Sequence, residues 1–222
     1  MPIKKSDPLR PIEPRWPVAL TILVVFVLVA MLHNRIKIFP DWFRYAAGIT
    51  VLVSIAAVPL TGAKARWRRV ERMAIVFFFG VMEAGILVGL TRLINEMVNR
   101  TQEIGGLQLF TSSIVVWVTN VLMFSRLYSQ SDRGGPEARI NNGRTRPDWL
   151  FPQTEVSQEV LPDWRPMFVD YLFLAFTTAT AFSPTDALPL TARAKLLMMF
   201  ESSISLMTIV VVAARAINIL GS

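Results

Sequence analysis

Residues 194–220, AKLLMMFESSISLMTIVVVAARAINIL, form an apolar run in which Glu201 is the only acidic residue. About 20 such residues in a helix cross the roughly 30 Å hydrocarbon core of a bilayer. Comparable apolar blocks lie upstream of this run, at residues 17–32, 43–60, 73–93, 107–127 and 166–183. The sequence therefore predicts an all-α fold, a polytopic transmembrane helical bundle of about six spans.

The composition of the 222-residue chain agrees with this fold class. Hydrophobic residues make up 53% of the chain and charged residues 18%, and the mean hydropathy is +0.45, a balance unlike that of a soluble domain. Cysteine is absent and histidine occurs once, which excludes disulfides, thiolate nucleophiles and the common zinc sites. No nucleophile–base pair stands at a recognisable spacing either. We therefore expect no enzyme activity, no cofactor and no metal site.

The distribution of basic residues predicts how the chain lies in the membrane, because cytoplasmic connections carry the excess of Lys and Arg. With a cytoplasmic N-terminus, the inner segments hold the basic residues of 4–15, 64–72 and 126–165, and the outer segments hold fewer. We expect both termini to lie in the cytoplasm. The net charge of +7 is interpreted as contact with anionic lipid, and no nucleic-acid partner is expected.

The predicted spans divide the chain into four regions. Residues 1–16 form a basic cytoplasmic arm, residues 17–127 a four-span transmembrane bundle, residues 128–165 a polar cytoplasmic loop, and residues 166–222 a C-terminal transmembrane hairpin. The polar region contains Gly, Asn and charges of both signs, a composition typical of a flexible loop.

The tripeptide Pro-Asp-Trp occurs at residues 147–149 and 162–164 of this loop, and also at residues 40–42. Proline ends the preceding structure, aspartate caps a helix N-terminus, and tryptophan suits the membrane interface. We interpret these tripeptides as membrane-surface anchors at helix entries.

Three acidic residues lie inside predicted spans, where a charged side chain costs roughly 2.5–3.5 kcal/mol on insertion scales. Glu83 is in the middle of the third block, Asp170 lies one turn into the fifth, and Glu201 lies about two turns into the sixth. Acids at such positions normally face the interior of the bundle. They are therefore candidates for function.

Polar residues continue from these acids along one face of each of the last two blocks. Ser205 and Thr208 follow Glu201 at helical spacing, and Thr177 and Thr180 follow Asp170 in the same way. A tight outer turn between the two blocks sets Thr177 level with Glu201 in an antiparallel hairpin. In the fourth block, Asn120 is expected to bond across to another helix.

These residues define a predicted polar intramembrane site, to which Glu83 contributes from a similar depth in the third block. Two desolvated carboxylates do not both stay ionised, so either a proton is bound or a cation lies between them. In the alternative interpretation each glutamate is neutral and hydrogen-bonded to a neighbouring span, which it holds in place. The site consists of Glu83, Asp170, Thr177, Thr180, Glu201, Ser205 and Thr208.

The run VDYLFLAFTTATAFSPTD at residues 169–186, continued through residues 189–195 to AARAINIL at the C-terminus, resembles the C-terminal hairpin of a family of small, uncharacterised bacterial inner-membrane proteins with a domain of unknown function. The resemblance covers about the last 55 residues. It implies a bacterial inner-membrane protein with a six-span fold and no established activity.

The same stretch is remotely similar to the pore helix and inner helix of tetrameric potassium channels, with Thr177 and Thr178 where the filter would begin and Glu201 near the outer end of the apolar helix. Residues 179–183 contain no glycine, although a potassium filter needs glycine so that its carbonyls line the axis. A conventional potassium filter is therefore excluded. The charge distribution also predicts that residues 166–183 cross the membrane and that residues 184–186 form an outer turn.

We therefore expect an ion-channel-like protein that binds or passes a monovalent cation or a proton, alone or as a homo-oligomer in the lipid bilayer. The alternative is a non-conducting membrane component that binds a partner through residues 128–165 and uses its intramembrane acids as structural contacts.

Overall fold

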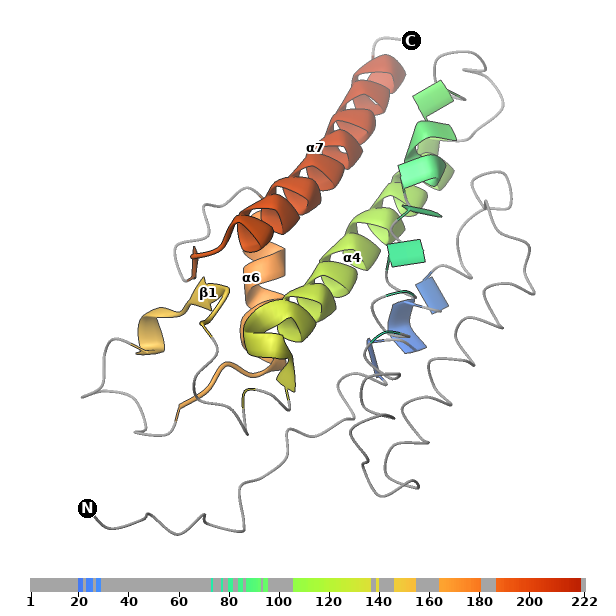
Figure 1. Cartoon of the computed structure of the whole chain (residues 1–222). Coiled ribbons are helices and arrows are strands. Elements are labelled where there is room, and N and C mark those ends of the chain that lie inside the picture. Colours follow the sequence, from blue (N-terminus) through green and yellow to red (C-terminus); the bar gives the residue numbers. More distant parts are fainter. Residues whose placement is uncertain are drawn as a thin grey trace, which may run out of the picture.

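The computed structural model describes residues 106–136, 139, 146–154, 164–180 and 187–220, together with scattered positions between residues 20 and 28 and between residues 73 and 95. The part of the chain that it describes is mostly helical (Figure 1). The elements are α4 (Gly106–Ser131), η1 (Asp132–Gly134), β1 (Trp149–Leu150), η2 (Pro152–Thr154), α6 (Phe168–Thr180), β2 (Leu188–Pro189) and α7 (Ala192–Leu220).

Two of these helices are long and apolar enough to cross a membrane. The qualifying stretches are Phe110–Gly134, which includes most of α4, and Ala192–Ala214 in α7, with 25 and 23 residues. At 1.5 Å per residue the shorter stretch extends over about 35 Å, which exceeds the hydrocarbon core. The predicted blocks at residues 17–32, 43–60 and 73–93 lie for the most part outside the described residues. The prediction of six spans therefore stays a prediction.

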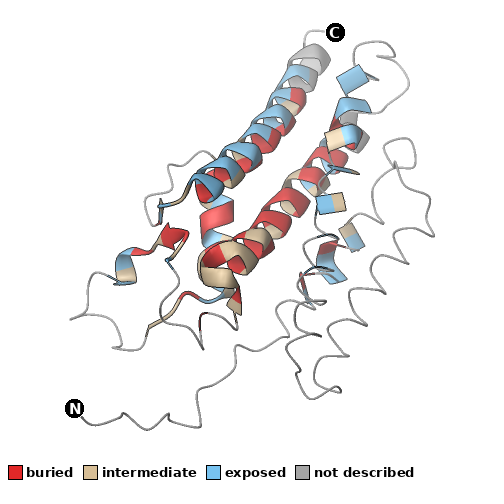
Figure 2. Ribbon diagram, in the orientation of Figure 1, coloured by how far each residue is buried: buried red, intermediate tan, exposed pale blue. Residues whose placement is uncertain are grey.

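The outward surface of α7 is apolar, as expected for a helix with lipid as its solvent. Figure 2 shows the exposed residues of α7 turned away from α4, with the buried ones facing it. Large hydrophobic side chains are exposed along α7 on both sides of residues 201–205, an arrangement that a water-soluble surface rarely shows. They include Leu196, Met199, Phe200, Leu206, Met207, Ile209 and Val210.

The helices α4 and α7 pack side by side in opposite directions (Figure 1). Near the C-terminal end of α4, Tyr128 contacts Glu201, close to the start of α7. Earlier in α4, Asn120 contacts Ser205, further along α7. The end of the bundle at which α4 ends with Ser131 and α7 begins with Ala192 is called the loop end below.

The short helix α6 also runs opposite to α4, and therefore in the same direction as α7. Its first residue, Phe168, lies under the Arg126 guanidinium group, with 5.4 Å from Cζ to the ring centroid. Near its other end, Phe176 packs edge-on against Trp117 at 5.8 Å between ring centroids. The helix thus enters from the loop end and points toward the middle of α4.

The chain returns to the loop end after α6. Before the return, the Tyr171 hydroxyl in α6 donates to Asp132, just past the end of α4, at 2.6 Å. After the return, Arg193 donates to the carbonyl of Ser131, the last residue of α4, at 2.8 Å. With only 13 residues, α6 is about 20 Å long, too short to cross a bilayer. The chain is therefore at the loop end both where α6 begins and again at residues 187–193.

This arrangement differs from the antiparallel hairpin predicted for residues 166–222. The Ser202 hydroxyl donates to the Thr178 carbonyl at 3.3 Å, so Thr177 and Glu201 lie at nearly the same height, as predicted. The two helices, however, run in the same direction and not in opposite directions. Hydropathy records how apolar a block is and not whether it crosses, because a half-length helix followed by a return has the same composition as a full span.

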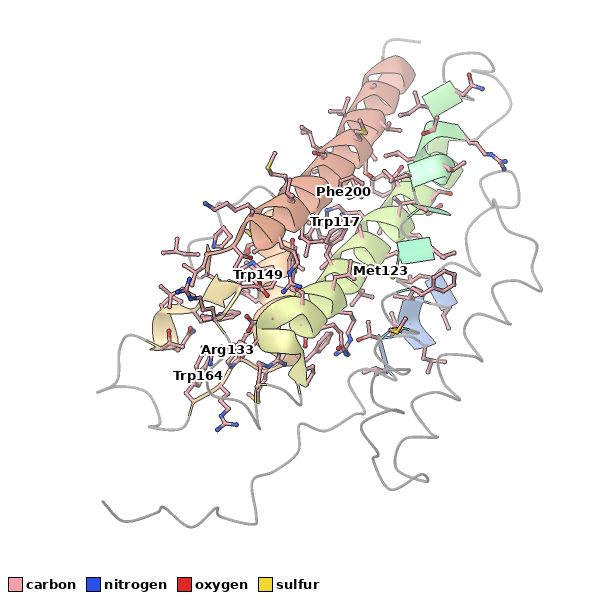
Figure 3. All side chains as sticks on the ribbon, in the orientation of Figure 1. Trp117, Met123, Arg133, Trp149, Trp164 and Phe200 are labelled. Atoms are coloured by element: carbon pink, nitrogen blue, oxygen red, sulfur yellow. The ribbon has the colours of Figure 1, made fainter. Side chains whose placement is uncertain are left out.

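Part of the loop predicted at residues 128–165 is packed against the bundle. The helix α4 continues to Ser131, and β1 pairs antiparallel with β2, with Trp149 opposite Pro189 and Leu150 opposite Leu188. Trp149 is only 1% exposed and lies beside the start of α7 (Figure 3), so it is a core residue and not an interfacial anchor. Its sequence neighbours alone do not reveal the aromatic pocket that receives it.

Candidate functional site

A buried polar column fills the interface between α4 and α7. The α7 members are Glu201, Ser205 and Thr208, which are 0%, 1% and 2% exposed, and the α4 members are Asn120 and Tyr128, both fully buried. The α7 residues are those of the predicted stripe. Their spacing of four and three places them on one face of the helix, and this face packs against α4.

Hydrogen bonds between the helices connect the members of the column. The Tyr128 hydroxyl donates to the Glu201 carboxylate. The Asn120 side-chain amide donates to the Ser205 hydroxyl at 2.9 Å and lies 3.3 Å from the Glu201 carbonyl oxygen. Thr208 donates to the carbonyl of Ile204 in its own helix at 2.8 Å. The prediction that Asn120 bonds across to another helix is confirmed.

The residues predicted on α6 do not join the column. The hydroxyl of Thr177 donates to the Phe173 carbonyl at 3.0 Å, and that of Thr180 donates to the Phe176 carbonyl at 2.8 Å. Both threonines are half-buried, whereas the fully buried face of α6 is a different one. It consists of Tyr171, Leu174, Ala175, Thr178 and Ala179, and its alanines allow close approach of the neighbouring helices.

Asp170 lies in the first turn of α6 and stabilises the start of that helix. Its carboxylate accepts a hydrogen bond from the Met167 amide at 2.6 Å, and a negative charge there interacts favourably with the helix dipole. Glu83, the remaining acid of the predicted site, lies outside the described residues.

Tyr128 is the member of the column that the sequence analysis missed. It lies two helical turns after Asn120 on α4, in a position that continues the same ridge of side chains. Its spacing of eight residues from Asn120 was the sequence signal that could have identified it. A tyrosine near the end of an apolar block is otherwise typical of the membrane interface, so burial of its hydroxyl against an acid does not follow from composition.

A second polar cluster holds the loop end together. Asp132 accepts hydrogen bonds from the Tyr171 hydroxyl at 2.6 Å and from the Asp148 amide at 2.8 Å. The Asp148 carboxylate accepts from Thr191 at 2.6 Å and forms an ion pair with Arg193. Both aspartates are buried. The predicted capping role of Asp148 is thus replaced by contacts to Thr191, just before α7, and to Arg193 in its first turn.

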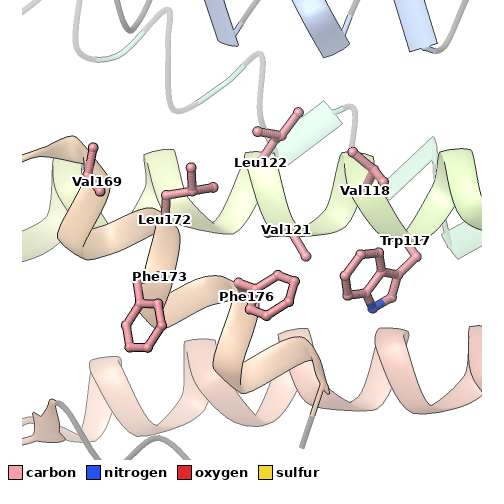
Figure 4. Close-up of a pocket in the computed structure, with 8 residues that line it drawn as sticks. All are labelled: Trp117, Val118, Val121, Leu122, Val169, Leu172, Phe173 and Phe176. Atoms are coloured by element: carbon pink, nitrogen blue, oxygen red, sulfur yellow. The ribbon is translucent and has the colours of Figure 1, made fainter. Parts of the chain in front are cut away.

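An apolar groove lies between α4 and α6, separate from the column (Figure 4). It has a volume of about 370 Å³ and no polar side chain in its lining apart from the indole of Trp117. Hydrocarbon suits such a surface, and an ion does not. The lining residues are Trp117, Val118, Val121, Leu122, Val169, Leu172, Phe173 and Phe176.

The chemistry available in the column is that of oxygen ligands and exchangeable protons. Within the described part of the chain, no group of three or more His, Cys, Asp or Glu side chains could hold a metal ion. The buried side-chain oxygen of Asn120 has no hydrogen-bond partner among the described residues. One carboxylate, one phenol, one amide and two hydroxyls suit a proton or a weakly held hard cation.

Comparison with known proteins yields no relative: no protein-family model, curated protein or solved structure matches the chain.

Proposed function

We propose that this protein spans the membrane and passes a small monovalent cation or a proton through a module formed by α4, the re-entrant α6 and α7. The observation that supports this proposal best is the return of the chain to the loop end after the 13-residue helix α6. Non-helical backbone at membrane depth is tolerated only where protein buries it or where it lines a water-filled cavity. A chain that turns back inside the membrane is thus typical of pores and transporters.

The direction of α6 favours a positive ion. Its C-terminal end points into the membrane, and the carbonyl end of a helix carries a partial negative charge. The Thr178 carbonyl lies in this last turn and accepts a hydrogen bond from Ser202, the residue that follows Glu201. The helix end and the buried acid are therefore at a similar depth, and both attract a cation or a proton.

Basic residues support a cytoplasmic loop end. Arg193 and Lys195 follow the returning segment, so this proposal puts them on the same side of the membrane as the polar loop. The basic-residue count from sequence alone assigned them to the outer side. The positive-inside rule then gives this end a large excess. Since α7 crosses once more, this proposal puts the C-terminus on the opposite side of the membrane from the loop. The basic residues at this end are Arg133, Arg139, Arg144, Arg146, Arg165, Arg193 and Lys195.

A non-conducting membrane component is the second candidate. It is favoured by the hydrogen bonds themselves, because Asn120 and Tyr128 connect α4 directly to α7 and the hydroxyls of Thr177 and Thr180 are bound within α6. In that case the column is structural, and its polar groups bring helices together in lipid.

Ion flux into liposomes separates the two candidates. Purified protein is reconstituted in phosphatidylethanolamine–phosphatidylglycerol vesicles, and potassium and proton flux are measured for the wild type, Glu201→Gln and the matched control Ser203→Ala, an exposed position on α7. We expect flux in the wild type and the control, and a loss of at least tenfold in Glu201→Gln. Absence of flux from the wild type, or flux indifferent to Glu201→Gln, contradicts transport through the column.

A further inference from the structure

We propose that Trp149 seals the loop end of the polar column and that the Asp148–Arg193 ion pair holds the seal in place. This inference rests on the proposed function, because it makes residues 146–151 the closure of the proposed route. These residues are called the strap below. Trp149 is a positioning residue in this account, since it contacts the neighbours of Glu201 and not an ion.

Trp149 fills the space between α4 and α7 just outside the buried acid. Its ring lies 4.8 Å from the ring of Tyr128 between centroids, and the Tyr128 hydroxyl binds Glu201. On the other side, the indole nitrogen is 3.4 Å from the sulfur of Met198, which precedes Glu201 by three residues and so lies one turn nearer the loop end. Trp149 thus contacts two residues that lie next to Glu201 on the side of the loop end.

Further aromatic rings close the same end toward α6. Phe151 packs edge-on against Tyr171 at 5.5 Å and also contacts Trp164 at 5.9 Å. Aromatic side chains exclude water over a large area for each residue buried. Together with Trp149 they form one apolar, aromatic layer at the loop end, which also includes the ring of Tyr128.

The strap is held by contacts that converge on Asp148. Its carbonyl accepts from Leu190 and its carboxylate binds Thr191 and Arg193. Thr191 in turn accepts from the Ala194 amide and so caps α7. The strap is thereby fixed to the first turn of the helix that carries Glu201.

The ion pair between Asp148 and Arg193 is exposed to solvent on the arginine side. The Asp148 side chain is 5% exposed, whereas that of Arg193 is 56% exposed. Arg193 also donates to the Ser131 carbonyl, and loss of the pair leaves a buried carboxylate with fewer partners. Removal of Arg193 is therefore expected to loosen the strap without removing Trp149.

An engineered thiol reports on the seal directly, because the chain contains no cysteine. Ser205→Cys places one thiol in the column, and Thr154→Cys places one on an exposed turn outside it. The full-length protein in detergent is treated with a charged methanethiosulfonate, and the modification rate is followed by mass spectrometry. We expect the thiol at position 205 to react at least tenfold faster with Trp149→Ala, several-fold faster with Arg193→Gln, and at nearly the wild-type rate with Trp149→Phe.

Two controls keep the result specific. The thiol at position 154 should react equally in all backgrounds, and a thiol at the buried position 116 of α4, from Val116→Cys, should stay slow. Equal rates at position 205 with and without Trp149 overturn the seal, and so does a parallel increase at position 116, which indicates general loosening. Labelling needs no transport, so a protein that shows the predicted rates and no flux refutes the proposed function and leaves the closure by Trp149 intact.

Discussion

The Tyr128 hydroxyl donates a hydrogen bond to the Glu201 carboxylate across 73 residues of sequence, and both side chains are fully buried between α4 and α7. This contact joins the two helices that are long enough to cross a membrane. It also places the acid of α7 behind the aromatic layer of the loop end.

Tyr128→Phe removes the phenol hydroxyl and keeps the ring that packs on Trp149. Loss of one partner from a buried hydrogen bond typically costs about 1–3 kcal/mol. We expect the free energy of unfolding to fall by that amount in a denaturant titration of the detergent-solubilised protein. Ser203→Ala, on the exposed face of α7, is the control. A change within experimental error for Tyr128→Phe contradicts the contact.

Asn120→Ala removes the amide that binds both Ser205 and the Glu201 carbonyl. Hydrogen bonds between membrane helices contribute about 0.6 kcal/mol each on average, so a destabilisation of about 1–2 kcal/mol is expected. Thr177→Ala should change stability by less than about 0.5 kcal/mol, because its hydroxyl binds only its own helix. Thermal unfolding measures both changes. A larger loss of stability for Thr177→Ala than for Asn120→Ala contradicts this account and favours a packed interior face of α6 that contains Thr177 and Thr180.

Trp149→Ala should be among the most destabilising single changes in the described part of the chain. Truncation of a buried Trp typically costs about 3–5 kcal/mol. Trp164→Ala, at a half-buried position, should cost clearly less. The ratio of folded to aggregated protein in detergent, measured by size-exclusion chromatography on heating, checks the order. Equal tolerance of both changes is the result expected of two interfacial anchors, and contradicts the core position of Trp149.

The sequence predicts the long helices and one face of α7 because these depend on local patterns. The apolar blocks at residues 107–127 and 194–220 coincide with α4 and α7, and the spacing of Glu201, Ser205 and Thr208 indicates the face that is buried. Asn120 was likewise interpretable, since an amide in an apolar span needs a partner.

The path of residues 166–183 was not predictable in the same way. An apolar block of 18 residues is compatible with a crossing or with a short helix and a return, and only contacts such as Tyr171–Asp132 and Arg193–Ser131 separate the two. The assignment of Thr177 and Thr180 to the interior failed for a related reason. Threonine hydroxyls in a membrane helix bind their own backbone, so polarity alone does not choose the packed face.

The re-entrant path of α6 is the central claim, and the position of two reporters tests it most directly. One topology reporter is inserted after Asn142 in the polar loop, and the other is fused after Ser222, each in an otherwise unchanged chain. Because α7 crosses once and α6 returns, we predict that the two reporters lie on opposite sides of the membrane, with the loop in the cytoplasm. Two reporters on the same side mean that residues 166–183 cross, and contradict the account.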